Sequence, residues 1–247
     1  MNKDVLLVER RGKNGEIVIL RTNRPEFQNR SNWEFKERSA EVYEALLEDK
    51  NAAVIVVTGV GDYFATGGQL NASDPEEKRR YQEAQKRVKA AMAKIQIPTI
   101  AAINGDCFAG GMSILIDADI AVSVDTAKFG YPEINRGGFP MMAMIAAMDV
   151  IPKKLLLEAF YSGELFSAAR AKEMGLLNAV VSKDDFWPTV ERYIDMIVSK
   201  PKELLAIGRR SYNEMSRMPV ADRPAYGRKA LSEILDVQGR LQPENEK

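Results

Sequence analysis

The sequence contains no histidine and only one cysteine, Cys107. A serine-histidine-aspartate triad, a cysteine-histidine dyad and a histidine-based zinc site are therefore excluded. One cysteine forms no internal disulfide and no cysteine cluster for a metal. The composition predicts that any chemistry rests on carboxylates, hydroxyls, amides or the backbone, with no metal site.

Excess charge of one sign and long apolar segments are also missing. Lysine and arginine total 35 and aspartate and glutamate total 35, so the formal net charge is zero and gives no general attraction for nucleic acid. No run approaches the roughly 18 apolar residues of a membrane-spanning helix. The first 20 residues lack the apolar centre of a secretory signal. We expect a cytoplasmic protein with neither a membrane nor a nucleic-acid partner.

The sequence does contain short apolar runs of strand length. These runs are rich in valine, isoleucine and alanine, and they predict buried strands at 17–20, 53–58, 99–103 and 120–124. The intervening segments 33–49 and 74–95 follow a helical period. Strands that alternate with helices predict an α/β fold. After Pro188 the remaining patterns are helical, at 190–198, 201–218 and 228–237. We therefore expect a core over residues 1–188 and a helical C-terminal region over 189–247.

Two glycine-bearing segments are the first candidates for chemistry. FATGGQL, residues 64–70, follows a predicted strand, and NGDCFAGGMS, residues 104–113, joins a strand to an apolar helix. Adjacent glycines let a ligand approach the backbone closely, and a helix N-terminus presents free N–H groups. Two such loops would present N–H donors to one developing oxyanion. The alternative for either loop is an ordinary turn whose glycines accept a positive φ.

A third segment places one carboxylate among apolar residues, glycines and prolines. Glu133 lies in FGYPEINRGGFP, residues 129–140. Loss of water raises the pKa of a glutamate toward the range in which a general base works. The alternative is a surface glutamate paired with Arg136. The order of the three segments along the chain favours the functional interpretation.

These three segments, with TNRPEFQN before them and SGELFSAARAKEMGLLNAVV after them, resemble the crotonase (enoyl-CoA hydratase/isomerase) family over roughly residues 5–190. The resemblance implies a spiral of ββα units and a helical C-terminal region used in trimer assembly, as a homotrimer or a dimer of trimers. It implies an acyl-CoA thioester substrate, chemistry through a thioester enolate, and no cofactor beyond the CoA moiety of the substrate.

The resemblance also implies roles for individual residues. The backbone N–H groups of Gly68 and Gly110 would form the oxyanion hole, and Glu133 would be the acid–base group. CoA contacts are expected at Phe27, Gln28, Gly68, Gln69, Leu70, Asn71 and Gly110. An acyl pocket is expected around Asp106, Ser113, Phe139, Met141 and Met142, where methionines replace the usual glycine-rich family pattern and predict an adaptable apolar wall. The alternative is that these methionines are ordinary core residues of a helix.

The chain departs from the hydratases of this family at one position, where Ser113 replaces the first of two glutamates. A hydroxyl does not act as a carboxylate acid or base near neutral pH. Double-bond isomerisation adds no water and needs one base, so it is the favoured expectation. The alternative is hydration with Asp106 or Asp117 as the substitute carboxylate. A further alternative is a non-catalytic scaffold that binds CoA or RNA.

Overall fold

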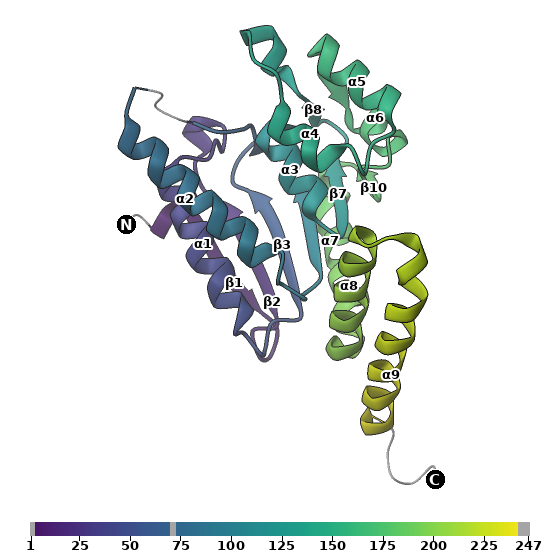
Figure 1. Ribbon diagram of the computed structural model, residues 1–247. Helices are drawn as coiled ribbons and strands as arrows, with labels where there is room; N and C mark the ends of the chain where they lie inside the picture. Colours follow the sequence, from purple (N-terminus) through teal and green to yellow (C-terminus); the bar gives the residue numbers. More distant parts are fainter. Residues whose placement is uncertain (1–2, 70–72, 242–247) are drawn as a thin grey trace.

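A six-stranded sheet forms the centre of the computed structural model, which describes residues 3–69 and 73–241 (Figure 1). Two predicted CoA contacts, Leu70 and Asn71, lie outside the described residues. The sheet has the order β1-β2-β3-β5-β7-β10. Its strands are β1 (Leu6–Arg11), β2 (Ile17–Thr22), β3 (Val54–Gly59), β5 (Thr99–Ile103), β7 (Ile120–Val124) and β10 (Ala179–Val181). β1 pairs antiparallel with β2, and each of the other pairs is parallel.

A smaller sheet of short strands lies beside it. Its order is β4-β6-β8-β9, in which the first three strands are parallel and β9 runs antiparallel to β8. These strands are β4 (Tyr63–Ala65), β6 (Asp106–Phe108), β8 (Lys128–Gly130) and β9 (Phe166–Ser167). Strands that follow one another in the chain after β2 thus alternate between the two sheets. β3, β5 and β7 belong to the larger sheet, and β4, β6 and β8 belong to the smaller one.

Helices follow these strand pairs. The first three are α1 (Trp33–Leu47), α2 (Pro75–Met92) and α3 (Gly110–Asp117). The order β1-β2-α1, β3-β4-α2, β5-β6-α3 confirms the predicted ββα units. The next elements are the 3-10 helix η3 (Pro132–Arg136), then α4 (Met141–Ala147), α5 (Lys153–Ser162) and α6 (Ala168–Glu173). Short 3-10 helices also occur at η1 (Lys3–Val5), η2 (Pro25–Phe27) and η4 (Val220–Asp222).

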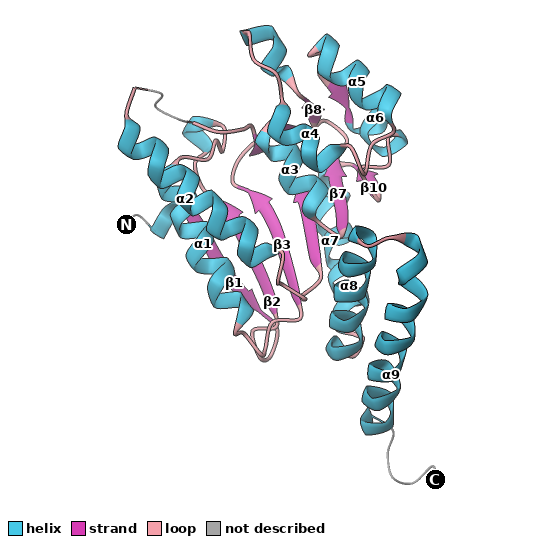
Figure 2. Ribbon diagram, viewed as in Figure 1, coloured by secondary structure: helices cyan, strands magenta, loops and turns pink. Residues whose placement is uncertain are grey.

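The larger sheet is buried on both faces, which explains its continuous apolar strands. Val18 and Leu20 of β2 belong to a core with α1 and α2, whereas Ile17 and Ile19 belong to the core that includes α7 (Lys183–Val198). Successive side chains of a strand point to opposite faces, so this strand serves two cores. Figure 2 shows α1 and α2 side by side over one face of the sheet.

Side-chain caps begin two of the predicted helices. Asn32 Oδ1 accepts a hydrogen bond from the backbone N–H of Phe35 at 2.9 Å and begins α1. Asp74 Oδ1 accepts from the backbone N–H groups of Glu76 and Glu77 at 2.9 and 3.1 Å and begins α2. Both residues satisfy donors that have no partner inside the helix.

The C-terminal helices differ in how they pack. The expected division between residues 188 and 189 falls inside α7, whose Phe186, Val190 and Ile194 lie in the main core. α8 (Lys202–Arg217) and α9 (Arg223–Leu241) pack on each other and project from the body (Figure 1). Arg209 of α8 holds this hairpin to the sheet, because its Nε donates to Asp119 Oδ2 at 2.7 Å.

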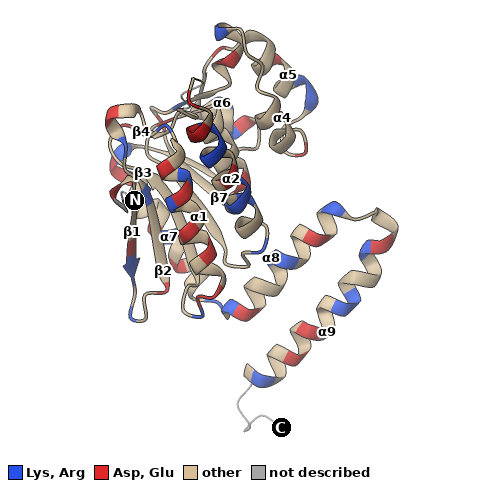
Figure 3. Ribbon diagram, turned by 60° about the vertical axis from the view of Figure 1, so that its left-hand side comes forward, with Lys and Arg blue, Asp and Glu red and all other residues tan. Residues whose placement is uncertain are grey.

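Charge is mixed over these helices. Figure 3 shows basic and acidic residues interleaved along α8 and α9. Within the described ranges, no helix has both the length and the apolar character needed to cross a membrane.

Candidate active site

The three segments singled out in the sequence follow three neighbouring strands of the smaller sheet. β6 lies between β4 and β8 and runs parallel to both, with Ala65 opposite Cys107 and Phe108 opposite Gly130. The residues that come directly after these strands therefore meet at one edge of the sheet: 66–68, 109–110 and 131–133. The carboxyl ends of parallel strands are where α/β folds place ligands.

The two glycine loops are in direct contact at this edge. A Cβ built on Gly67 would lie 3.2 Å from Ala109 Cβ and 3.9 Å from Gly110 N. Gly67 has a φ of 110°, which favours glycine. Ala109 itself has a φ of 49° and a ψ of −117°, an unfavourable conformation for a residue with a side chain. Its N–H donates to Gly130 O at 3.0 Å, so the end of β8 holds this strained residue in place.

The N–H groups of Gly68 and Gly110 are available to a ligand. Ser31 N donates to Gly67 O at 2.9 Å and Gln69 N donates to Ser31 O at 2.8 Å. Backbone groups alternate in direction along an extended chain, so the Gly68 N–H points away from Ser31. Gly110 is the first residue of α3, where the N–H has no acceptor within the helix. Both glycines are exposed, and no acceptor for either N–H is found in the part of the chain that the structure describes.

A buried arginine organises the segment where CoA contacts were predicted. Arg24 has 6% of its surface exposed, and its Nη2 donates to Gln69 Oε1 at 2.9 Å. Its guanidinium lies 4.7 Å from the centre of the Phe27 ring. Burial lowers the pKa of Arg24, while Glu26 and Glu34 oppose that shift. Among the described residues no carboxylate forms an ion pair with Arg24. The sequence alone did not indicate a role for Arg24, because no sequence pattern distinguishes a buried arginine from an exposed one.

The same segment is tied to the first glycine loop by further hydrogen bonds. Thr66 Oγ1 donates to Gln28 O at 2.7 Å. Asn29 Nδ2 donates to the carbonyl oxygens of Val60 and Tyr63 at 3.0 and 2.6 Å. The structure therefore brings together Phe27, Gln28, Gly68 and Gln69. Their contact with CoA stays a prediction.

Glu133 lies at the same edge and is half-buried. Burial raises the pKa of its carboxyl, and its own backbone N–H and the charge of Arg136 oppose the rise. Its Oε2 is buried and accepts no hydrogen bond from the part of the chain that the structure describes. No ion pair joins Glu133 to Arg136 there, which contradicts the surface-pair interpretation. A carboxyl held in this state suits a general base.

Proteins of known family are similar to most of this chain. Residues 12–238 match the protein family described as enoyl-CoA hydratase/isomerase. The chain belongs to this family. It is 35% identical over 175 residues to the hydroxycinnamoyl-CoA hydratase-lyase of Pseudomonas fluorescens, a match that covers 67% of this chain and 63% of that protein. It is 31% identical over 182 residues to the enoyl-CoA hydratase EchA19 of Mycobacterium tuberculosis, covering 71% and 67% of the two chains.

A solved structure extends this likeness over nearly the whole fold. The enoyl-CoA hydratase of Mycobacterium smegmatis superposes with a TM-score of 0.86 and 25% identity, over 92% of this chain and 90% of that one. The part of the chain that matches the family, residues 12–238, thus includes strands of both sheets, α8 and most of α9.

The other polar residues that were predicted to line the pocket differ in where they lie relative to Gly68 and Gly110. Ser113 is partly buried on α3, three residues after Gly110 and therefore on the same helix face. Asp106 begins β6, at the opposite end of that strand, and its Oδ1 accepts from Lys128 N at 2.9 Å. Asp117 is exposed at the last position of α3. Of these three candidates, Ser113 is the one that lies within one turn of a donor, Gly110, on the same helix.

The apolar pocket candidates follow η3. Phe139 contacts the Phe160 ring edge-on, with centroids 5.7 Å apart. Met141 and Met142 begin α4 and are 54% and 65% exposed. They stand next in the chain after Glu133 and its turn, and their role in an acyl pocket stays a prediction.

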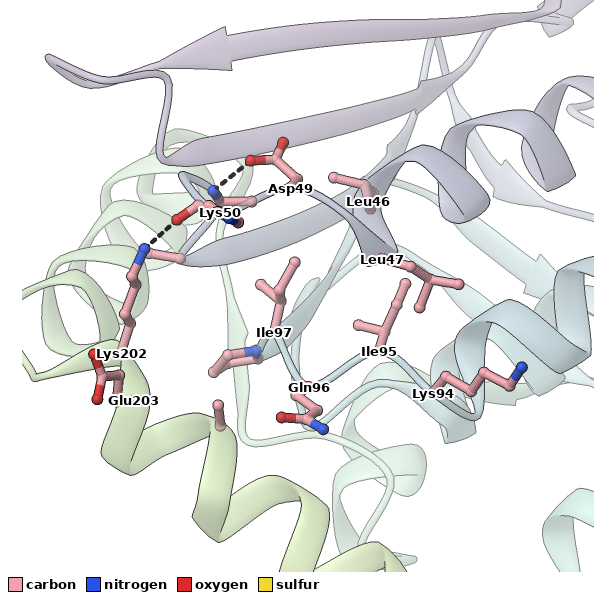
Figure 4. A pocket seen from close by; sticks show the side chains of 14 residues that line it. Leu46, Leu47, Asp49, Lys50, Lys94, Ile95, Gln96, Ile97, Lys202 and Glu203 are labelled. Carbon is pink, nitrogen blue, oxygen red and sulfur yellow. Dashed lines mark hydrogen bonds between the residues drawn. The ribbon is translucent and has the colours of Figure 1, made fainter. Parts of the chain in front are cut away.

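A cavity of about 410 Å³ lies elsewhere, at the amino ends of β3 and β5 (Figure 4). Lys202 of α8 lies along one side of it and donates to the Lys50 carbonyl oxygen. Its lining includes none of the glycine donors and not Glu133. Its size would admit a small ligand, but its residues offer none of the chemistry described above.

Proposed function

We propose that this chain transfers a proton on an acyl-CoA thioester through an enolate. Glu133 is the acid–base group, and the backbone N–H groups of Gly68 and Gly110 bind the thioester oxygen as negative charge develops on it. The favoured reaction is migration of a double bond from the 3 to the 2 position. Glu133 removes a proton from C2 and returns one to C4, so the step needs one base and no added water.

The observation that carries this proposal is the shared edge of β4, β6 and β8. It supplies two unused N–H donors on one side and a carboxyl with a raised pKa on the other. An oxyanion-hole donor contributes about 10²- to 10³-fold to rate, and a positioned general base about 10²- to 10⁴-fold. Both contributions come from residues that follow neighbouring strands of one sheet.

The rest of the site follows from this substrate. Phe27, Gln28, Gly68 and Gln69 contact the CoA moiety, and no cofactor beyond that moiety takes part. Leu70 and Asn71 complete this set. Phe139, Met141 and Met142 contact the acyl chain. We further propose a homotrimer or a dimer of trimers in the cytoplasm, which agrees with the apolar side chains exposed on α9 at Leu231, Leu235 and Leu241.

Solvent deuterium exchange into saturated, 2-enoyl and 3-enoyl CoA thioesters tests the proposal by mass spectrometry. Wild type should incorporate label at C2 or C4, and Glu133→Gln should reduce the rate by about 10²- to 10⁴-fold while retaining CoA binding. Glu164→Gln is the matched control, because Glu164 is exposed on the loop after α5. Conversion of 3-enoyl to 2-enoyl thioester identifies the isomerase. Absence of Glu133-dependent exchange on every thioester refutes the enolate mechanism.

Hydration is the second candidate, and two observations favour it. The two relatives described above are a hydratase-lyase and a hydratase. Ser113 also lies on the face of α3 that carries Gly110, where its hydroxyl would hold a water or a substrate hydroxyl. A gain of water by a 2-enoyl thioester in the same assay, reduced in Ser113→Ala, identifies this reaction. A scaffold that binds CoA or RNA would show binding without turnover, and RNA retention would weaken as salt rises.

A further inference from the structure

The peptide group between Gly67 and Gly68 connects the proposed oxyanion donor to the interior of the protein. Its N–H is the Gly68 donor, and its carbonyl is that of Gly67. The peptide is trans, and in a planar trans peptide the C=O and the N–H point in opposite directions. Any group that fixes the Gly67 oxygen therefore also sets the direction in which the Gly68 N–H points.

Ser31 binds this carbonyl oxygen twice. Its backbone N–H donates to Gly67 O at 2.9 Å, and its side-chain Oγ donates to the same oxygen at 3.3 Å. Ser31 is 8% exposed and forms a parallel bridge with Gly68. An alanine at position 31 would keep the backbone hydrogen bonds of this bridge. The buried hydroxyl therefore adds something that the bridge alone does not supply.

Tyr81 of α2 extends the contact by one more hydroxyl. Its oxygen lies 3.1 Å from Ser31 Oγ. A serine hydroxyl carries one proton, and because Ser31 gives it to Gly67 O, the Tyr81 hydroxyl is the donor to Ser31. Burial raises the pKa of Tyr81 by more than the hydrogen bond with Ser31 lowers it, so the hydroxyl keeps its proton near neutral pH. The same oxygen would lie 3.2 Å from a Cβ built on Gly68, so Tyr81 also packs against the donor residue.

The position of α2 does not depend on this hydroxyl. Val88 of α2 and Leu46 of α1 lie in one apolar core. Arg80 of α2 also donates two hydrogen bonds, at 3.0 and 2.8 Å, to the carboxylate of Glu37 on α1. A phenylalanine in place of Tyr81 would therefore leave the helix in place and remove only the hydrogen bond.

We propose that Ser31 and Tyr81 are positioning residues that act through the Gly68 N–H. The Tyr81 hydroxyl donates to Ser31, and the Ser31 hydroxyl donates to Gly67 O. The Gly68 N–H, at the other end of this peptide, donates to the thioester oxygen. Each hydrogen bond in such a chain polarises the next, so the two hydroxyls both orient this donor and strengthen it. Their role in catalysis rests on the proposed function, whereas the hydrogen-bond chain that ends at Gly68 does not.

Isotope labelling tests this peptide by itself. In protein that carries glycine labelled with ¹⁵N and with ¹³C at the carbonyl, an NMR correlation between a carbonyl and the following amide appears only for glycine pairs. In this sequence the glycine pairs are 67–68, 110–111 and 137–138. The signal of pair 67–68 is the one that disappears in Gly68→Ala.

The chemical shifts of this signal report the hydrogen bonds that Gly67 O accepts. Removing a donor makes the peptide less polarised, so Ser31→Ala should move the ¹³C and ¹⁵N resonances of pair 67–68 upfield. Tyr81→Phe should move them in the same direction by less, and the signal of pair 137–138 should stay in place in both variants. Unchanged shifts of pair 67–68 in Ser31→Ala overturn the inference.

Deuterium exchange tests the consequence for the reaction. Ser31→Ala should lower the exchange rate at saturating thioester by about 2- to 13-fold, the value of one hydrogen bond between neutral groups, while KM stays the same. Tyr81→Phe should lower the rate by a smaller factor. Because Tyr81 acts through Ser31, the double variant should be no slower than Ser31→Ala. Ser39→Ala is the matched control and should exchange at the wild-type rate, because Ser39 is also buried but donates to Phe35 O within α1.

The outcomes separate this inference from the proposed function. A Ser31→Ala protein in which only KM or Tm changes, or in which nothing changes, overturns the role of Ser31 in the reaction. Additive losses in the double variant overturn the chain from Tyr81 through Ser31. A wild type without Glu133-dependent exchange overturns the proposed function instead, and the labelled peptide still decides whether the two hydroxyls act on Gly68.

Discussion

Replacing Gly111 by alanine should move the N–H of Gly110 away from the N–H of Gly68, although neither of these two proposed donors is itself replaced. A Cβ built on Gly111 would lie 2.1 Å from the carbonyl oxygen of Ala65 and 2.9 Å from its carbon. Both atoms belong to the backbone of β4, so no side-chain rotation relieves the overlap. Because carbon and oxygen approach each other to about 3.3 Å at closest, the start of α3 must move away from β4 by roughly 1 Å.

The size of the effect follows from this displacement. Extra atoms in a well-packed site lower the free energy of unfolding by about 1–3 kcal/mol. For a chain of this size that corresponds to a fall in Tm of about 2–12 °C. A displacement of about 1 Å at a reacting centre lowers the rate by about 10²-fold. We expect Gly111→Ala to lose most of its exchange activity while remaining folded at 25 °C.

Thermal unfolding and deuterium exchange, measured on the same preparations, check this expectation. Gly208→Ala is the control, since Gly208 lies inside α8 and nothing lies within 4 Å of the added Cβ. It should raise the free energy of unfolding by about 1 kcal/mol through helix propensity alone and leave exchange unchanged. A Gly111→Ala protein with wild-type Tm and wild-type exchange would show that the contact between α3 and β4 does not position the donors.

Two further predictions concern stability. The pKa of Glu133 in the folded state is raised above its ordinary value of 4.5. Wild type therefore loses stability as the pH rises from 4.5 through the folded-state pKa, and Glu133→Gln does not. As the pH rises above 4.5, the Tm of Glu133→Gln should therefore rise relative to that of wild type, and a constant difference would contradict the raised pKa. Asn29 is 1% exposed and bonds the backbones of Arg24, Val60 and Tyr63. Asn29→Ala should lower the free energy of unfolding by about 3 kcal/mol, and an unchanged urea midpoint would refute this role.

The long elements were predictable because their pattern extends over many residues. The predicted strands at 99–103 and 120–124 have the observed bounds, and α1 and α2 end two to three residues before the predicted limits. β4, β6 and β8 have three residues each, too few for a periodicity to emerge. These short strands are nevertheless what bring the three segments to one edge.

The candidate site was predictable to the extent that it depends on residue type. Paired glycines and an isolated glutamate stand out in a chain without histidine, and the family resemblance ordered them. Arg24 does not stand out, because a buried and an exposed arginine look the same in a sequence. Its burial arises from packing between segments far apart in the chain, which only the fold supplies.

Both oxyanion donors belong to the main chain, and this affects how the protein tolerates mutation. Apart from proline, no side-chain replacement deletes a backbone N–H group, so other substitutions at these loops reduce activity only when they move the backbone or block access to it. The residues that follow Glu133 in α4 are under no such restriction, because no strand pairing depends on them. Under the proposed function, substitutions in α4 therefore alter which acyl group is accepted while the two N–H donors stay in place, so selection can change the substrate without rebuilding the chemistry.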